Sequence, residues 1–175
     1  MRTLDISKNL FFHYEAVEKV ENYYGLLAYW ALAQTAEEAG DERLLSYVKE
    51  CLREYPRAAE GQHFNFKSYQ CGGNGRAYLA WRHLWEGQED ILREYAGKML
   101  QSPTDRAGIL CMPKDVEKER VWIDVVTCVT PFMLYAGKVL GEEAYCAFGV
   151  RQCFRMFDLL EDPENGLLHQ SRGFL

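Results

Sequence analysis

The chain has 175 residues, of which 48% are hydrophobic and 26% charged, ordinary values for a globular protein that exclude a disordered chain. Its net charge of −6 argues against a nucleic-acid backbone as the main partner, because such binding needs clustered Lys and Arg. The sequence shows neither a membrane span nor a secretory hydrophobic segment, so we expect no membrane partner and one globular domain over residues 1–175.

Helical periodicity predicts almost every element of the chain. Gly40 supplies a stop for the second helix, Pro56 is expected to end the third, and Pro131 is expected to bend or break a long apolar helix. The expected helices are 8–20, 22–39, 41–56, 76–85, 89–100, 123–140 and 142–160. Residues 60–74 and 104–120 are predicted as loops, and 162–166 as a turn.

An internal repeat organises these helices into hairpins. Gly40 is followed by acidic residues, an apolar pair and Pro56, and Gly87 is followed by the same pattern and by Pro103 at the same distance. Gly141 begins a looser third copy. The acidic residues suit a helix N-terminus, where the helix dipole favours negative charge. Each copy is therefore interpreted as two helices joined by a short turn, although such junctions occur in any all-α protein.

Hairpins that repeat at this spacing predict a helical solenoid or a closed ring. The connections between hairpins are long, and long loops on one face of a scaffold usually build a site, which favours the ring. We therefore predict an all-α fold of the (α/α)6-toroid type, with about half of the barrel present. The domain is expected to be incomplete at its C-terminus, and its open hairpin edge to promote self-association.

The six cysteines are interpreted as small buried thiols. No two form a C-x-x-C pair, and those at 51, 128, 146 and 153 lie in apolar helical patterns. Disulfides or a metal site are the alternatives. We expect a cytoplasmic protein with no metal and no cofactor.

The sharpest candidate for chemistry is Asp124, which follows Trp122 at the head of an apolar helix. A carboxyl group in apolar surroundings is poorly solvated, which favours its protonated form and suits a general acid. The opposing interpretation is that Asp124 caps the helix or lies in its first turn, where Asp is common.

Three further stretches are candidates for binding. His169 follows the predicted turn, although a lone His there is often an ordinary surface residue. The loop 63–76 offers aromatic rings, amides and two cations, Lys67 and Arg76, for an anion, or it is a structural turn. Residues 21–25 open the second helix and are interpreted either as a cleft edge or as core. On a toroid all four stretches would converge at one mouth.

Two motifs then resemble a known family. Trp122 and Asp124 before an apolar helix with Pro131-Phe132, and the downstream segment 162–169 ending in His169, resemble the unsaturated uronyl hydrolases of glycoside hydrolase families 88 and 105. The resemblance covers essentially the whole chain, as the N-terminal half of the family's barrel. It implies an oligosaccharide substrate with a 4,5-unsaturated uronic acid at its non-reducing end, left by a polysaccharide lyase.

The resemblance also implies roles for individual residues. Asp124 would protonate the C4=C5 double bond, and water would add at C5, so the hydrolysis is triggered by hydration. The substrate-binding residues implied or suggested are Trp122, His169, Asn65, Lys67, Tyr69, Asn22 and Tyr23. Where many members carry a second Asp, before the second hairpin, this chain has none, and where some place a His upstream of the catalytic Asp it has Cys111. The family's later site segment falls beyond residue 175.

Two rival functions remain open at this point. The first is a non-catalytic helical-repeat scaffold, or a truncated inactive fragment, that binds glycan or protein. The second is another toroid enzyme such as a sugar epimerase, which needs a pair of proton-transfer groups, typically His. Four scattered histidines give that reading little support.

Overall fold

The computed structural model describes residues 3–17, 23–60 and 73–173, and its regular elements there are helical apart from one short ribbon. The helices are α1 Thr3–Val17, α2 Tyr23–Ala39, α3 Glu42–Glu60, α4 Gly73–Trp81, α5 Glu89–Leu100, α6 Asp124–Cys128, α7 Thr130–Leu140 and α8 Glu143–Leu160, with a 3-10 turn at Pro113–Asp115. Two strands, β1 Val121–Trp122 and β2 Ser171–Arg172, pair antiparallel. Among these helices we find none with the length and hydrophobicity that a membrane span requires.

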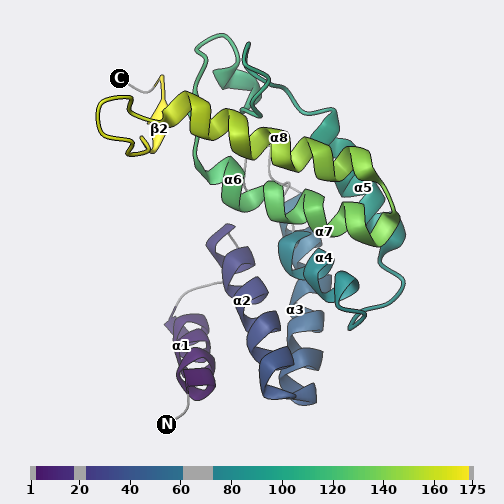
Figure 1. Cartoon of the computed structure of the whole chain (residues 1–175). Coiled ribbons are helices and arrows are strands. Elements are labelled where there is room, and N and C mark those ends of the chain that lie inside the picture. Colours follow the sequence, from purple (N-terminus) through teal and green to yellow (C-terminus); the bar gives the residue numbers. More distant parts are fainter. Residues whose placement is uncertain (1–2, 18–22, 61–72, 174–175) are drawn as a thin grey trace.

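The helices form a curved row of three hairpins, α2–α3, α4–α5 and α7–α8 (Figure 1). Helix α4 packs against α2 on one side and α7 on the other, so α2, α4 and α7 make an inner layer. Close approach between α7 and α8 depends on Gly137, because a Cβ there would lie 2.5 Å from the Cys146 sulfur. The all-α prediction and the three predicted hairpins are confirmed.

The buried core is divided into two clusters. The first joins α1, α2 and α3 with Leu79 of α4, and the second joins α4 to α8 with the loop 101–120. The largest fully buried side chains are Phe132, Leu52, Leu79, Leu92, Met99, Ile109, Leu110, Met133, Met156, Leu160 and Gln152. Gln152 is the only polar residue of that set, which places a hydrogen-bonding group on the buried side of α8.

The predicted glycine–acid junctions are present within the hairpins. Gly40 and Gly141 adopt left-handed backbone conformations, with φ of 59° and 68°, and each ends a helix of the inner layer. The Asp41 carboxylate accepts a hydrogen bond from the Leu44 amide at 3.0 Å and so caps α3. The α4 prediction was less accurate, because α4 begins at Gly73 and ends at Trp81, well before Gly87.

Pro131 lies at a break between two helices, whereas Pro56 lies within a helix that continues past it. The long apolar helix predicted over 123–140 is broken at Val129 into α6 and α7, with Pro131 in the first turn of α7, as expected. The prediction that Pro56 ends the third helix was wrong, since α3 continues to Glu60.

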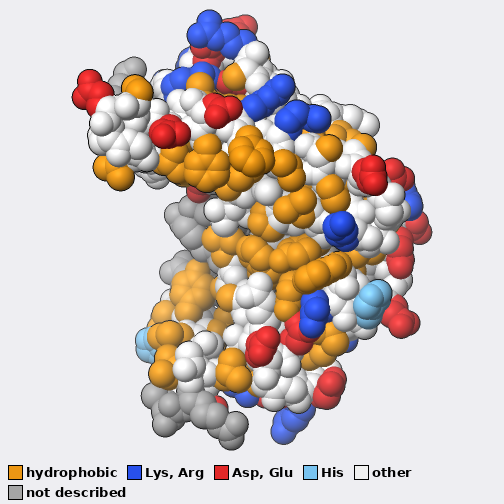
Figure 2. All heavy atoms as spheres, viewed as in Figure 1, with side chains coloured by type: hydrophobic (Ala, Val, Ile, Leu, Met, Phe, Trp, Pro, Cys, Tyr) orange, Lys and Arg blue, Asp and Glu red, His pale blue; other side chains and the backbone are white. Residues whose placement is uncertain are grey.

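Both ends of the row leave hydrophobic side chains exposed, as the open edge predicted. Helix α8 exposes Val150, Phe154 and Phe157, spaced so that they share one face. Helix α1 exposes Leu10 and Val17 among others. Figure 2 shows hydrophobic side chains gathered along α8 and again near α1 and α2.

Candidate active site

The three inner helices run in the same direction, so their N-terminal ends lie on one side of the row of hairpins. Near its start α4 contacts α6 through Asn74 and Thr127, and near its end Trp81 stacks on Tyr135 of α7, with ring centroids 5.2 Å apart. Helix α2 runs alongside α4 in the same sense, because Gly75 near the start of α4 lies against Trp30, whereas Tyr78 further along α4 donates to Glu37 near the end of α2. The mouth predicted from the sequence is therefore formed by the beginnings of α2, α4 and α6.

The β1–β2 ribbon brings the two sequence motifs together at this mouth. Trp122 pairs with Ser171, and the Ile123 amide donates to the Gln170 carbonyl at 2.9 Å. His169 immediately precedes this pairing, and its own amide donates to the Leu160 carbonyl at the end of α8. The backbone that carries Trp122 and Asp124 thus lies beside the backbone that carries His169, although α6, α7 and α8 separate them in the chain.

Asp124 is the first residue of α6 and is partly exposed. Ile123 is the N-cap residue, and no side chain caps this helix end. Within the described part of the chain, the Asp124 carboxylate has neither a hydrogen bond nor an ion pair. It occupies the first turn, as the structural interpretation held, but caps nothing, so both of its oxygens are available to a ligand.

The other predicted site residues fall into three groups. Trp122 is half-buried and packs against the second core cluster, whereas His169 is exposed. Tyr23 is the first residue of α2, at the same mouth as Asp124. The remaining predicted residues, Asn22, Asn65, Lys67 and Tyr69, lie outside the described residues.

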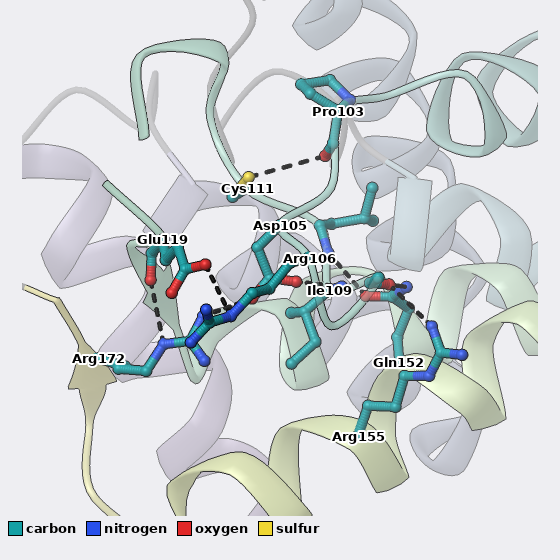
Figure 3. Close-up of polar contacts among 11 residues, drawn as sticks. Pro103, Asp105, Arg106, Ile109, Cys111, Glu119, Gln152, Arg155 and Arg172 are labelled. Carbon is teal, nitrogen blue, oxygen red and sulfur yellow. Dashed lines mark hydrogen bonds and ion pairs between the residues drawn. The ribbon is translucent and has the colours of Figure 1, made fainter. Parts of the chain in front are cut away.

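The loop 101–120 is held on the flank of this mouth by a buried amide (Figure 3). The Gln152 side chain accepts a hydrogen bond from the Leu110 amide at 2.9 Å and donates one to the Gly108 carbonyl at 2.8 Å. Gln152 is 1% exposed, so both bonds are made away from water. Arg155, one turn further along α8, also donates to the Gly108 carbonyl, at 3.4 Å.

An ion pair ties the same loop to the ribbon. The Asp105 carboxylate accepts from the Ile109 amide at 2.8 Å and pairs with Arg172 of β2 at 2.5 Å. The Arg172 guanidinium also donates to the Glu119 carbonyl at 3.1 Å, and Glu119 pairs with Arg106 (Figure 3). These contacts connect the loop to the strand that pairs beside Trp122.

Two residues from the sequence analysis prove to be structural. Arg76 was expected to help bind an anionic sugar, and this was wrong, because its guanidinium is buried and donates to Gln88 and to the Leu52 carbonyl. Cys111 is buried, and burial together with Asp105 and Asp115 raises the pKa of its thiol to about 11. It stays a neutral thiol near pH 7 and cannot act as a thiolate nucleophile there.

Comparison with known proteins identifies the family. A model of Glycosyl Hydrolase Family 88 matches residues 6–174, nearly the whole chain. The chain belongs to this family. A search among curated proteins finds no match. Among the residues that the structure describes, no group of three or more His, Cys, Asp or Glu side chains is placed to hold a metal ion.

A solved structure shows the architecture of this family 88 chain. It is described as a possible member of GH105 family from Salmonella enterica serovar Paratyphi A, and it matches with a TM-score of 0.69 at 16% identity. The match covers 87% of this chain but 41% of that one, so this chain spans less than half the length of the solved protein. The three hairpins are thus about half of an (α/α)6 toroid.

Sequence reasoning missed the residues that hold the site of this family 88 chain in place. Gln152 lies in a helix whose apolar pattern indicated only packing, and Asp105 and Arg172 lie far apart in the sequence. A Gln on the apolar face of α8 was the one signal that could have marked a buried polar contact.

Proposed function

We propose that this family 88 domain, within a complete ring, removes a 4,5-unsaturated uronic acid from the non-reducing end of oligosaccharides produced by polysaccharide lyases. Family membership supports glycoside hydrolysis. The choice of substrate follows from the resemblance carried by Trp122, Asp124 and the segment that ends at His169. The proposal also draws on the position of Asp124 at the mouth of the inner helices.

The reaction begins with proton transfer from the Asp124 carboxyl group to C4 of the C4=C5 double bond. Water adds at C5, giving up a proton to the carboxylate that remains, so one residue serves as acid and then as base. The resulting hemiketal at C5 opens by cleavage of the bond from C5 to the ring oxygen, which leaves a ketone at C5. The hemiacetal at C1 then releases the remaining sugar as an alcohol and becomes an aldehyde.

Substrate binding falls to the residues around this carboxyl group. Trp122 supplies an aromatic surface beside Asp124, and His169 a hydrogen-bonding ring on the neighbouring strand. The polar and aromatic groups that we assign to the rest of the sugar site are Asn22, Tyr23, Asn65, Lys67 and Tyr69. Lys67 would offset the carboxylate of the uronic acid, since the chain as a whole is negatively charged.

The observation that carries the proposal is the carboxylate of Asp124, which is partly exposed and forms neither a hydrogen bond nor an ion pair with the described residues. Asp124→Asn keeps the shape of the side chain but removes the proton donor. The assay follows the ultraviolet absorbance of the C4=C5 double bond in an unsaturated disaccharide, with the chain assembled in a complete ring. Asp90→Asn is the matched control, because Asp90 also lies in the first turn of a helix, α5, but in the outer layer.

We expect Asp124→Asn to abolish the loss of absorbance while Asp90→Asn leaves it unchanged. Turnover that survives Asp124→Asn would exclude this residue as the acid. Binding of the disaccharide by the unaltered chain without any turnover would favour the alternative, a glycan-binding scaffold or an inactive fragment. Calorimetry on the same samples distinguishes binding from turnover.

We also propose the cytoplasm as the location of the protein. The proposal draws on the free thiols of Cys51, Cys111, Cys128, Cys146 and Cys153 among the described residues. A reducing compartment keeps such thiols free. Fractionation of cells that express the tagged protein tests this, and recovery from a secreted fraction would contradict it.

A further inference from the structure

Two helices of this chain contain a backbone carbonyl that has lost its normal helical donor. In an α-helix the amide of residue i donates to the carbonyl of residue i−4, and proline has no amide hydrogen. Pro56 therefore leaves the Leu52 carbonyl of α3 without that donor. In the same way Pro131 leaves the Thr127 carbonyl of α6 without one.

Helix α4 supplies a side-chain donor to both carbonyls. The Asn74 amide nitrogen donates to the Thr127 carbonyl at 3.0 Å, and an Arg76 terminal nitrogen donates to the Leu52 carbonyl at 2.7 Å. Asn74 is 2% exposed and Arg76 is 5% exposed, so water does not compete for either bond. Two residues of one helix thus replace the missing amide hydrogens of prolines in two different neighbours.

The chemistry fixes the orientation of the Asn74 side chain. Only its nitrogen can donate to a carbonyl, so its oxygen points elsewhere, and that oxygen is buried without a hydrogen-bond partner among the residues that the structure describes. A buried acceptor that stays unpaired opposes folding. Asn74 is retained in this conformation in spite of that penalty, which indicates that its contact with Thr127 matters more.

The carbonyl that Asn74 binds belongs to the same short helix as Asp124. Helix α6 consists of the five residues Asp124–Cys128, so Thr127 is one turn away from the candidate acid. Helical hydrogen bonds continue on both sides of the gap, from Val129 to Val125 at 2.9 Å and from Met133 to Val129 at 3.0 Å. The Thr127 carbonyl is the point at which the proline interrupts this series.

We infer that Asn74 is a positioning residue for Asp124: its amide takes the place of the missing Pro131 donor and so fixes the orientation of the helical turn that begins with the acid. The role of Asp124 as the acid rests on the proposed function. The contact itself does not, because it concerns only backbone and side chains of this chain. Without this donor the Thr127 carbonyl would have to turn toward water, and the turn that carries Asp124 would tilt with it.

A double-mutant cycle on the 175-residue chain tests the contact. Asn74→Leu removes the donor in a similar volume, and Pro131→Ala restores a backbone donor to Thr127. In the unaltered background we expect Asn74→Leu to raise the unfolding equilibrium constant in urea by roughly tenfold. In the Pro131→Ala background most of that increase should disappear. An equal effect in both backgrounds would overturn the inference.

The second proline provides a matched control. Pro56→Ala restores a donor to Leu52, not to Thr127, so it should recover the part of the Arg76→Met effect that comes from the Leu52 carbonyl and leave the effect of Asn74→Leu unchanged. The part that comes from the lost hydrogen bond to Gln88 should remain. If Asn74→Leu alone does not fold, Pro131→Ala should recover folded protein and Pro56→Ala should not. Rescue of Asn74→Leu by both proline substitutions, or by neither, contradicts the specific pairing of Asn74 with the carbonyl that Pro131 leaves free.

The positioning role has its own measurement. The carboxyl carbon resonance of Asp124, observed in chain labelled with ¹³C aspartate, should shift in Asn74→Leu and stay in place in Arg76→Met, although both variants lose a buried hydrogen bond. A resonance that moves equally in both variants, or in neither, refutes the positioning role. Neither measurement uses catalysis, so a failure of the proposed function would appear only in the Asp124→Asn assay.

Discussion

The side chains of Asp105 and Arg172 meet at 2.5 Å although 67 positions separate them in the chain. The Asp105 side chain is fully buried and that of Arg172 is 28% exposed. Arg172 lies in β2, directly opposite Val121 of β1. The ion pair therefore links the loop before the candidate acid to the strand that follows α8.

Loss of this ion pair should destabilise the chain. Arg172→Met leaves a buried carboxylate with the Ile109 amide as its remaining described partner, and we expect the free energy of unfolding to fall by about 2 kcal/mol. Urea denaturation measures the change. Arg93→Met is the control, because Arg93 pairs with Asp90 at 3.6 Å on the exposed face of α5. Equal stability of the two variants would show that the ion pair has no structural role.

The amide of Gln152 should control the loop 101–120. Gln152→Leu preserves volume but leaves the buried Leu110 amide unpaired and the Gly108 carbonyl with only the long hydrogen bond from Arg155, at an expected loss of about 2 kcal/mol of unfolding free energy. Trypsin cleavage after the exposed Arg106 should become faster, as followed by mass spectrometry. Arg155→Ala removes only a long hydrogen bond from an exposed side chain and should change neither quantity appreciably. A rate of trypsin cleavage that is unaffected by Gln152→Leu would argue against a role of Gln152 in holding the loop 101–120.

Glu37 should contribute a pH-dependent part of the stability. Burial would raise the pKa of Glu37, but hydrogen bonds from Tyr78 and Arg82 and the charge of Arg82 outweigh it and hold the pKa below the usual 4.5. The native state then binds this proton less tightly than the unfolded chain. The contribution is fully present above pH 4.5 and is lost as the pH falls through the lower native value.

The corresponding variant is Glu37→Gln. It should be less stable than the unaltered chain at neutral pH, and the difference should narrow as the pH falls below 4.5. Urea denaturation over a pH series gives both curves. Glu94→Gln serves as the control, because its ion pair with Lys98 is exposed to solvent. A difference that stays constant with pH would contradict the assignment.

The exposed hydrophobic edge should make the isolated chain self-associate. Phe154 on α8 is 65% exposed and Leu10 on α1 is 64% exposed, at opposite ends of the helical row. Sedimentation velocity should show mass that rises with concentration, and Phe154→Lys or Leu10→Lys should reduce it. Asp158→Lys introduces the same side chain at an exposed polar position of α8 and should not. A compact monomer at all concentrations would exclude this association.

Helix existence could be predicted because it depends on local pattern. The apolar periodicity around Leu44 and Leu92 located two outer helices, and the break near Pro131 follows from the geometry of proline alone. The ribbon could not be predicted, because strands of two residues such as β1 have no periodicity. The pairing of β1 with β2 depends on the three-dimensional position at which α8 ends.

The part of the candidate site that could be predicted also depends on local pattern. The sequence placed Asp124 at the head of a helix, and the structure agrees. Arg76 was misjudged because its charge was visible in the sequence, while the carbonyl that Pro56 leaves free belongs to another helix. Continuation of α3 past Pro56 has the same cause, since a proline is tolerated when a neighbour satisfies the carbonyl that it exposes.

The β1–β2 ribbon also has a consequence for how the molecule opens. It fastens the two free ends of the third hairpin, so α6, α7 and α8 form a closed loop of chain that shares one hydrophobic cluster, separate from the cluster under α1 to α3. Fraying from either end of this loop must first break the ribbon. The third hairpin should therefore exchange its amide hydrogens as a single cooperative unit, later than the first hairpin, and the candidate acid Asp124 at its head would be among the last parts of the chain to lose its native surroundings.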